Sequence, residues 1–219
     1  PIWPDAVRAV PNGFLRSALF GTIRRGARRY MKRERIAALE GIEIYYTGER
    51  LDQGDLDVWE MILHIARLQG RGNECRVTAY QLLKALCKTD SSKNREILDI
   101  RLSRMNATGI DVHIGWFGYE GSLIDEVYRD KETREYVFRV NLKLRTLFEL
   151  DQFTQVDWAV RRQLGGQPLA QWLHGFYASH GLNRFRRLLV RWEKKPANYI
   201  APLHFARGLI AFRATGLFG

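Results

Sequence analysis

Arginine and lysine side chains gather in two stretches, and their spacing is the feature of this sequence that points most directly to a chemistry. Positions 16–35 hold eight basic side chains against Glu34 alone, and positions 182–219 hold eight against Glu193. The whole chain carries a formal charge of +11, so most of the excess lies in these two runs. Clustered cations bind polyanions, because each phosphate they neutralise releases condensed counterions. The pattern indicates a nucleic-acid partner, and the alternative is a solvated basic face.

Residues of the kinds that enzymes use are present but scattered. The sequence has five separated histidines and contains no GxxxxGK[ST] phosphate loop, no HxH or HExxH and no CxxC. The adjacent Tyr45 and Tyr46 have no metal-binding histidine pair that would activate a phosphate for attack. Asp52, Asp55 and Asp57 are interpreted as charges favoured at a helix start, with Asp55 as the N-cap. We therefore expect no catalytic residue, no metal and no cofactor, and a protein that is not an enzyme.

Two helices across a short polar turn are predicted between positions 76 and 108. The positions expected to face the core are Tyr80, Leu83 and Leu86 or Cys87 in the first helix, and Leu98, Leu102 and Met105 in the second. This is helix-turn-helix geometry, in which the second helix can enter a major groove. The alternative is an ordinary helix pair with a basic outer face. The candidate DNA contacts of this unit are Thr78, Ser91, Ser92, Lys93, Arg95, Arg101 and Arg104.

Three strands are predicted after these helices, at 110–116, 119–130 and 135–141, and the last two form a hairpin around Asp130–Thr133. Two helices followed by a β-hairpin is winged-helix order. Three basic side chains at the tip would then contact phosphate or the minor groove, namely Arg129, Lys131 and Arg134. The alternative is an ordinary polar turn.

The remaining elements supply the scaffold. A short helix is predicted from Asn12 to Gly21, a strand over 42–46 after a turn at Gly41, and a helix from Asp55 to Gly70 that is apolar on all sides. The chain of 219 residues is 46% hydrophobic, enough to build a core, and has no run of 18 apolar residues that could span a membrane. Its two cysteines make no disulfide framework, so we expect a reducing cytoplasm.

Five stretches of the sequence carry a specific resemblance. They read WPDAVRAVPNGFLRSALFG, IEIYYTGERLDQGDLDVWEMILHIAR, LSRMNATGIDV, GSLIDE and PLAQWLHGFY. Together, from about Ile2 to His180, they resemble the TrfA family of plasmid replication initiators. The resemblance implies tandem winged-helix domains that bind direct repeats, called iterons, in double-stranded DNA at a plasmid origin. It also implies opening of the adjacent AT-rich DNA, with single-stranded origin DNA as a further partner.

The same resemblance assigns roles to residues and partners. The recognition helix lies within 91–104 and the wing within 129–134. Additional backbone contacts come from the first basic run, through Arg24, Arg25, Arg28, Arg29, Lys32 and Arg33. The host partners it implies are DnaA, the DnaB helicase and the sliding clamp. Initiators of this kind exchange between a homodimer and a DNA-binding monomer, with the first domain as the dimer surface.

The sequence departs from that family after His180. Residues 182–219 resemble the carboxyl end of DDE transposases, without an acid in FYASHG where the third catalytic acid would fall. We therefore expect an α+β chain with a first winged-helix domain at 1–150, the incomplete start of a second at 151–181, and a basic amphipathic helical tail at 182–219. The alternatives are a catalytically dead transposase fragment and a fusion remnant that binds DNA without sequence preference.

Overall fold

One helix, α2 (Gln53–Gln69), lies at the centre of the part of the chain that the computed structural model describes, residues 3–23, 28–39, 41–69, 74–130, 132–133, 135–148 and 153–180. The indole of Trp59 is fully buried, and its Nε1 donates to the backbone carbonyl of Leu123 at 3.2 Å. Ring centroids at 5.4, 6.4 and 6.3 Å surround it, those of Phe14, Phe20 and Phe148. The apolar surface of α2 is thus buried on several sides, as its sequence predicts.

An antiparallel sheet in the order β3-β4-β7-β8 lies on one side of α2. Its strands are β3 (Tyr30–Ile36), β4 (Ile42–Glu49), β7 (Gly109–Ile114) and β8 (Phe117–Gly121). Side chains of a strand alternate between faces, and Ile44 and Tyr46 point into the core. Gly41 has a φ of +81°, the left-handed region that glycine adopts without strain, and it confirms the predicted turn before β4.

The predicted helix pair and hairpin form a second unit. The sheet order is β6-β10-β9, with β6 (Glu74–Thr78), β9 (Glu126–Arg129) and β10 (Glu135–Arg139). Between β6 and β7 lie α3 (Ala79–Ala85) and α4 (Ser92–Asn106). The strand expected over 119–130 was wrong as one piece, because Leu123 and Ile124 are fully buried and turn the chain from β8 in one sheet to β9 in the other.

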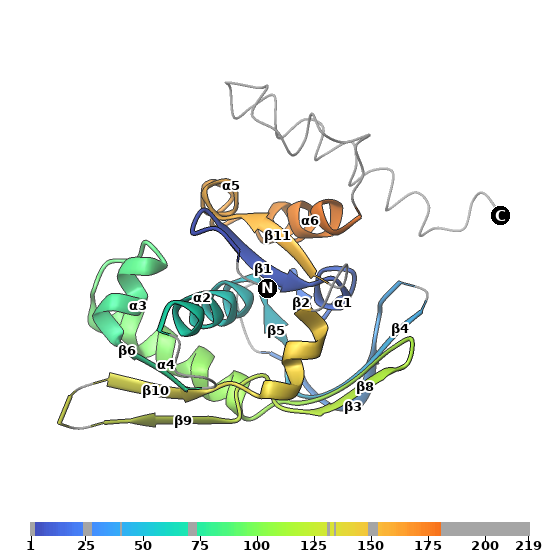
Figure 1. The fold of residues 1–219 in the computed structure, drawn as a ribbon, viewed down its shortest axis with the longest axis horizontal. Coiled ribbons are helices and arrows are strands. Elements are labelled where there is room, and N and C mark those ends of the chain that lie inside the picture. Colours follow the sequence, from blue (N-terminus) through green and yellow to red (C-terminus); the bar gives the residue numbers. More distant parts are fainter. Residues whose placement is uncertain are drawn as a thin grey trace, which may run out of the picture.

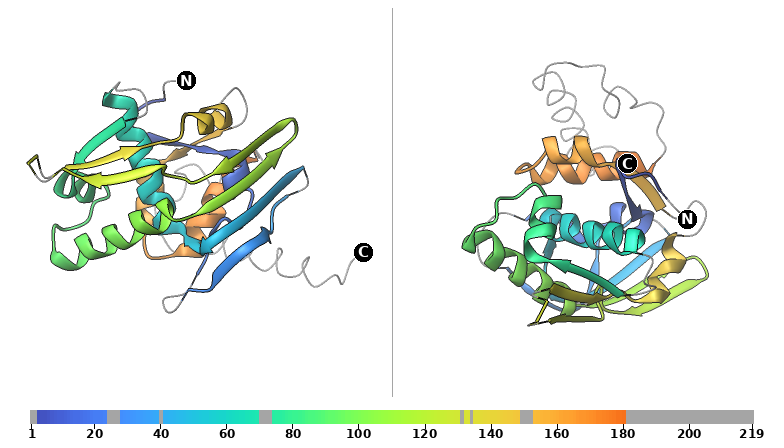
Figure 2. Two further views of the ribbon diagram at one scale, coloured as in Figure 1. Left: turned by 90° about the horizontal axis from the view of Figure 1, so that it is seen from below. Right: turned by 60° about the vertical axis from the view of Figure 1, so that its left-hand side comes forward.

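The segment expected to open a second domain packs against the amino-terminal part of the chain. In this segment β11 (Phe153–Asp157) pairs antiparallel with β1 (Val7–Pro11). Figure 2 shows α5 (Trp158–Gln163) and α6 (Pro168–Ser179) as a layer over α2, opposite the sheets. The domain boundary at residue 150 stays a prediction.

A short stretch near the amino terminus is less helical than expected. The helix predicted from Asn12 to Gly21 is a single turn, α1 (Asn12–Leu15), followed by β2 (Phe20–Gly21). β2 pairs in parallel with β5 (Leu51–Asp52), which leads directly into α2. Backbone pairing of Phe20 with Leu51 replaces further helical hydrogen bonds.

One connecting element completes the architecture. A 3-10 helix (Leu142–Phe148) connects β10 to the segment that begins with β11. Helices and strands occur together without regular alternation, which confirms the expected α+β class. Among the described residues, no helix is long and apolar enough to cross a membrane. The expected tail at 182–219 lies outside these residues.

Candidate nucleic-acid interface

One side of α4 is buried and the opposite side faces solvent. Leu98, Leu102 and Met105 are at most 2% exposed, as predicted. Helical spacing of three and four places a solvent-exposed stripe on the other side, which we call the outer face of α4 and which consists of Lys93, Glu96, Ile97, Ile100 and Ser103. It is the part of the α3–α4 helix pair that is open to a partner.

Hydroxyl side chains cap both helices of the unit. Ser91 Oγ accepts a hydrogen bond from the backbone N–H of Asn94 at 3.2 Å, which begins α4. Thr78 Oγ1 accepts from the N–H of Gln81 at 3.2 Å, and the Gln81 side chain accepts from the N–H of Thr78 at 3.0 Å. Thr78 and Ser91 therefore fix where the helices begin. Ser92, the first residue of α4, is exposed.

The β9–β10 hairpin is fastened to one flank of α4. Asp99 of α4 forms an ion pair with Arg129 of β9 and accepts a hydrogen bond from the hydroxyl of Tyr136 of β10. The Arg129 guanidinium lies 5.0 Å from the centre of the Tyr136 ring. Burial, together with the Asp99 carboxylate, raises the pKa of Tyr136 to about 12, so the phenol remains a donor. Arg129 thus positions the hairpin, although its side chain is 60% exposed.

The tip of the hairpin is closed by an acid. Asp130 Oδ1 accepts hydrogen bonds from the backbone N–H groups of Glu132 and Thr133 at 2.9 and 3.1 Å. The predicted turn is therefore present. The predicted tip contacts Lys131 and Arg134 lie outside the described residues.

Arg101 and Arg104, two of the candidate DNA contacts, do not lie on the outer face of α4, and their role in DNA binding stays a prediction. Arg101 Nη1 lies 2.6 Å from Asp52 Oδ1 and 2.8 Å from Asp55 Oδ1. Arg104 Nη1 lies 2.9 Å from Asp55 Oδ1, and its Nε lies 3.1 Å from Glu49 Oε2. The two arginine side chains are only 21% and 8% exposed. A fully buried Asp55 requires cationic partners, and the flank of α4 that faces α2 supplies them.

The start of α2 is capped by Asp52 and not, as predicted, by Asp55. Asp52 Oδ1 accepts from the N–H groups of Gly54 and Asp55 at 2.8 and 2.9 Å, and Asp55 Oδ2 accepts from the N–H of Asp52 at 2.8 Å. Burial by itself would raise the pKa of Asp52, but Arg101 and Arg28 outweigh it and hold that pKa well below its usual range. Asp52 is therefore ionised.

Arg28 belongs to the same ion-pair network. Its Nη2 pairs with Asp52, its Nη1 lies 3.5 Å from Asp55 Oδ2, and Nη1 also donates to the backbone carbonyl of Arg50 at 2.6 Å. Its side chain is only 17% exposed. The expected contact of Arg28 with the DNA backbone stays a prediction. The three arginines Arg28, Arg101 and Arg104 balance Glu49, Asp52 and Asp55, and together they join the basic run, α2 and α4.

Arg16 of the first basic run is half-buried and donates to Ser179 Oγ at 3.3 Å, whereas the remaining described cations of the run, apart from Arg28, lie at the surface. Arg29 pairs with Glu34 at 2.7 Å, and its side chain is 70% exposed. Arg33 of β3 pairs with Asp111 at 2.8 Å. Lys32, also in β3, is exposed. Arg24 and Arg25 lie outside the described residues.

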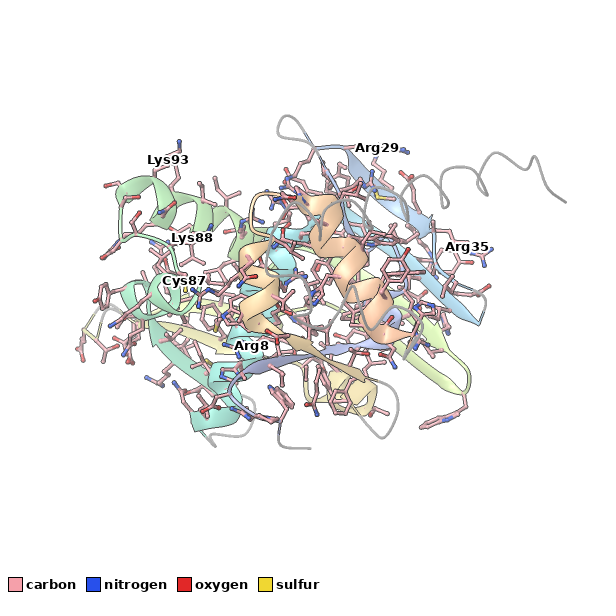
Figure 3. All side chains as sticks on the ribbon, turned by 90° about the horizontal axis from the view of Figure 1, so that it is seen from above. Arg8, Arg29, Arg35, Cys87, Lys88 and Lys93 are labelled. Carbon is pink, nitrogen blue, oxygen red and sulfur yellow. The ribbon has the colours of Figure 1, made fainter. Side chains whose placement is uncertain are left out.

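Figure 3 shows four of the surface cations at two separate places. Lys88 and Lys93, in and near α4, lie on the left of this view, whereas Arg29 and Arg35 lie on the right. Arg95 of α4 is exposed but bound to Asp90 at 2.6 and 2.7 Å. Within the described part of the chain, Lys88 and Lys93 form no ion pair.

Sequence reasoning missed several exposed residues of the unit. Tyr80 was expected to face the core but is 52% exposed, with the Nζ of Lys84 5.8 Å from the centre of its ring. Leu86, not the exposed Cys87, packs against the core. Ile97 and Ile100 are 39% and 49% exposed. Their positions three apart, out of phase with the buried leucines, were the signal that could have found them.

The part of the chain that the structure describes contains no candidate metal-binding site. No group of three or more His, Cys, Asp or Glu side chains is placed there to hold an ion. The arrangement instead offers a capped helix with an open outer face, fastened on one flank by the hairpin and on the other by the ion-pair network.

The fold defines an α+β protein built like two solved fragments of RctB. Crystal structures described as domain 2 and domain 3 of RctB and as RctB domains 2-3 match with TM-scores of 0.53 and 0.51, at 10% and 12% sequence identity. They cover 84% and 73% of this chain and 78% and 67% of those chains. At such low identity, the likeness concerns the fold alone.

The chain belongs to the TrfA protein family of plasmid replication initiators, whose profile matches residues 1–188. The plasmid replication initiator protein TrfA of Escherichia coli is 27% identical over 186 residues, which are 81% of this chain and 48% of that protein. The chain therefore spans about half the length of that relative. The family resemblance seen in the sequence is confirmed.

The expected transposase-like tail has no such support. The family match continues to residue 188, so the sequence does not leave the family at His180 as expected. The first residues assigned to the tail, 182–188, fall inside that match.

Proposed function

We propose that this chain binds double-stranded DNA at a plasmid origin through a winged-helix unit. The unit consists of α2, β6, α3, α4 and the β9–β10 hairpin, in that order along the chain. Its order and the pairing of β10 with both β6 and β9 support this assignment. On the proposal α4 is the recognition helix, and the hairpin is the wing that lies along the DNA backbone.

The observation that carries the proposal is the open outer face of α4 on a rigidly held helix. Its capped start presents Lys93 and Ser92 near the first turn, the part of a recognition helix that contacts base edges. Asp99 ties one flank to the hairpin, and Arg101 ties the other to α2. A helix held in this way can enter a groove without losing further conformational freedom.

Membership of the TrfA family extends the proposal. We propose direct repeats, or iterons, as the DNA target, with origin opening that exposes single-stranded DNA. The proposed host partners are DnaA, the DnaB helicase and the sliding clamp, and a homodimer exchanges with the DNA-binding monomer. The proposal gives the chain no catalytic step or cofactor and places it in the bacterial cytoplasm, where plasmid DNA is found.

A fluorescence-anisotropy titration of the full chain tests the DNA-binding proposal. The probes are a duplex of the plasmid's own origin repeats and a scrambled duplex of equal length, each over a salt series. Lys93→Ala tests the outer face, and Arg35→Ala serves as a control, because Arg35 is an exposed arginine of β3 paired with Glu43 at 3.0 Å. If Lys93 neutralises a phosphate, its loss reduces the salt slope by about one, and the control leaves the slope unchanged.

Three outcomes are informative. Preference for the repeats, together with an effect of Lys93→Ala alone, supports initiator-type recognition through α4. Equal binding to both duplexes that disappears steeply with salt would support a remnant that binds DNA without sequence preference. Equal losses from the two variants would show that α4 has no special place in the interface.

A further inference from the structure

The outer face of α4 carries two exposed isoleucines in the middle of the helix. Ile97 and Ile100 are 39% and 49% exposed, whereas Leu98 and Leu102 of the same helix are 2% exposed. Polar side chains surround the pair, with Lys93 and Glu96 before it and Ser103 after it. Neither isoleucine is needed to fill the core, so the exposed apolar surface requires another explanation.

We infer that Ile97 and Ile100 read the 5-methyl groups of thymine, so that the chain prefers sites with thymines at neighbouring base pairs. The inference rests on the proposed function and deepens it. In the major groove, the thymine methyl is the apolar feature that distinguishes one base pair from another, and apolar side chains contact it. An isoleucine offers such a contact and offers no hydrogen bond to any other base.

The spacing of the two side chains fits this readout. Residues three apart in an α-helix are separated by about 4.5 Å along its axis. Successive base pairs lie about 3.4 Å apart along one strand. Ile97 and Ile100 therefore reach neighbouring steps when α4 lies in the groove.

The charges around the pair favour DNA over a protein partner. Lys93 lies on the same stripe, Lys88 lies in the preceding turn, and Arg129 lies on the neighbouring hairpin with its side chain 60% exposed. The exposed acid of the outer face is Glu96, and a carboxylate in the major groove accepts from the amino group of cytosine. A protein interface instead has a larger apolar core, from which charged residues are depleted.

The test begins with selection of binding sites by the full chain from a pool of random duplexes. The enriched duplex is then synthesised with deoxyuridine in place of thymidine, which removes the 5-methyl group alone. Wild type is expected to bind the uracil duplex about fourfold more weakly for each contacted methyl, the factor given by burial of one such group. Ile97→Ala and Ile100→Ala should weaken binding to the thymine duplex and lose less than wild type on uracil substitution.

A matched control is Leu68→Ala, because Leu68 is 61% exposed at the end of α2. It should leave both affinities unchanged. Urea midpoints show whether each variant is folded, which is expected because the replaced side chains are exposed.

Each result is decisive. A pool from which no sequence is enriched refutes the proposed function itself. If wild type binds the enriched site equally well with uracil, the methyl readout is overturned while sequence-specific binding stands. The same holds if uracil weakens the binding of wild type and of the isoleucine variants alike. Unchanged DNA binding by both isoleucine variants, with an altered sedimentation coefficient, would assign the face to a protein contact and also overturn it.

Discussion

Replacement of Arg161 by methionine should strongly destabilise the packing of α5 on α2. Arg161 is 1% exposed, and its Nε lies 2.6 Å from Asp57 Oδ1 and 2.9 Å from Glu60 Oε1. Its Nη2 donates to Gln53 Oε1 at 3.1 Å and to the Gln53 carbonyl at 3.2 Å. Methionine fills similar space but offers neither the charge nor the donors, so the Glu60 carboxyl loses its nearest cation.

The expected loss is about 3 kcal/mol, at the lower end of the range for a broken buried ion pair. The lower end applies because Asp57 is 23% exposed and can hydrate. In addition, the pKa of Glu60 is raised to about 8, so at pH 7 its carboxyl is mostly protonated and loses less when the cation is removed. Arg162→Met removes an exposed arginine from the same helix, and surface changes of this kind stay within about 0.5 kcal/mol. Urea unfolding at pH 7, with m-values compared, measures both changes.

The pH dependence provides a second check. The usual pKa of a glutamic acid is 4.5, and burial raises that of Glu60 to about 8. Arg161 acts in the opposite direction and lowers the pKa, but burial outweighs it. Because the folded pKa lies above the unfolded one, the stabilisation from protonated Glu60 is fully present below pH 4.5 and is lost as pH rises to about 8. Without Arg161 the folded pKa rises further, so the loss of stability should continue to a higher pH. Two results together would refute this reasoning: an equal loss of unfolding free energy in Arg161→Met and Arg162→Met at pH 7, and a wild-type pH profile of stability in Arg161→Met.

Three further changes have defined outcomes. Burial lowers the pKa of His174 to about 4, so the contribution of His174 to stability should fall as pH drops from 6.5 toward 4. His174→Asn should remove that contribution from the slope of a urea-midpoint profile, and a profile with the wild-type slope would contradict it. Gly54→Ala places a Cβ 2.5 Å from an Arg101 nitrogen and should cost about 1–3 kcal/mol of unfolding free energy, measured with urea. In the control Gly109→Ala, the Cβ meets only an ordinary contact at 3.5 Å. Equal effects of the two changes would argue against the ion-pair network around Arg101. Ser91→Ala removes the cap of α4 and should cost about 1 kcal/mol in thermal unfolding, and no change would mean that the cap is dispensable.

Much of the α3–α4 helix pair and of the β9–β10 hairpin could be predicted from the sequence because their signals are local. The caps at Thr78 and Ser91 act on N–H groups three residues ahead. The buried stripe that includes Leu98 and Leu102 follows from helical periodicity, and Asp130 closes its turn with backbone groups two and three residues away. These interactions form within a few residues.

The partners of the arginines could not be read in the same way. Arg101 meets Asp52 across 49 positions of sequence, and Arg161 meets Asp57 across 104. In sequence, a basic residue at the edge of a helical stripe is equally suited to solvent, phosphate or a buried carboxylate. Burial of Asp55 settles the choice for Arg101 and Arg104, because an ionised carboxylate in the core requires nearby cations.

The sequence by itself determined the α+β class, the central apolar helix, the capped helix pair, the hairpin and the family. Those follow from periodicity, capping and ordered motifs along the chain. The tertiary structure alone decided that the strand after Tyr119 divides between two sheets, that β11 joins β1, and that the outer face of α4 presents isoleucines in place of Arg101 and Arg104. Each of these features depends on contacts between segments that are distant in the sequence, and the local spacing of residues does not predict such contacts.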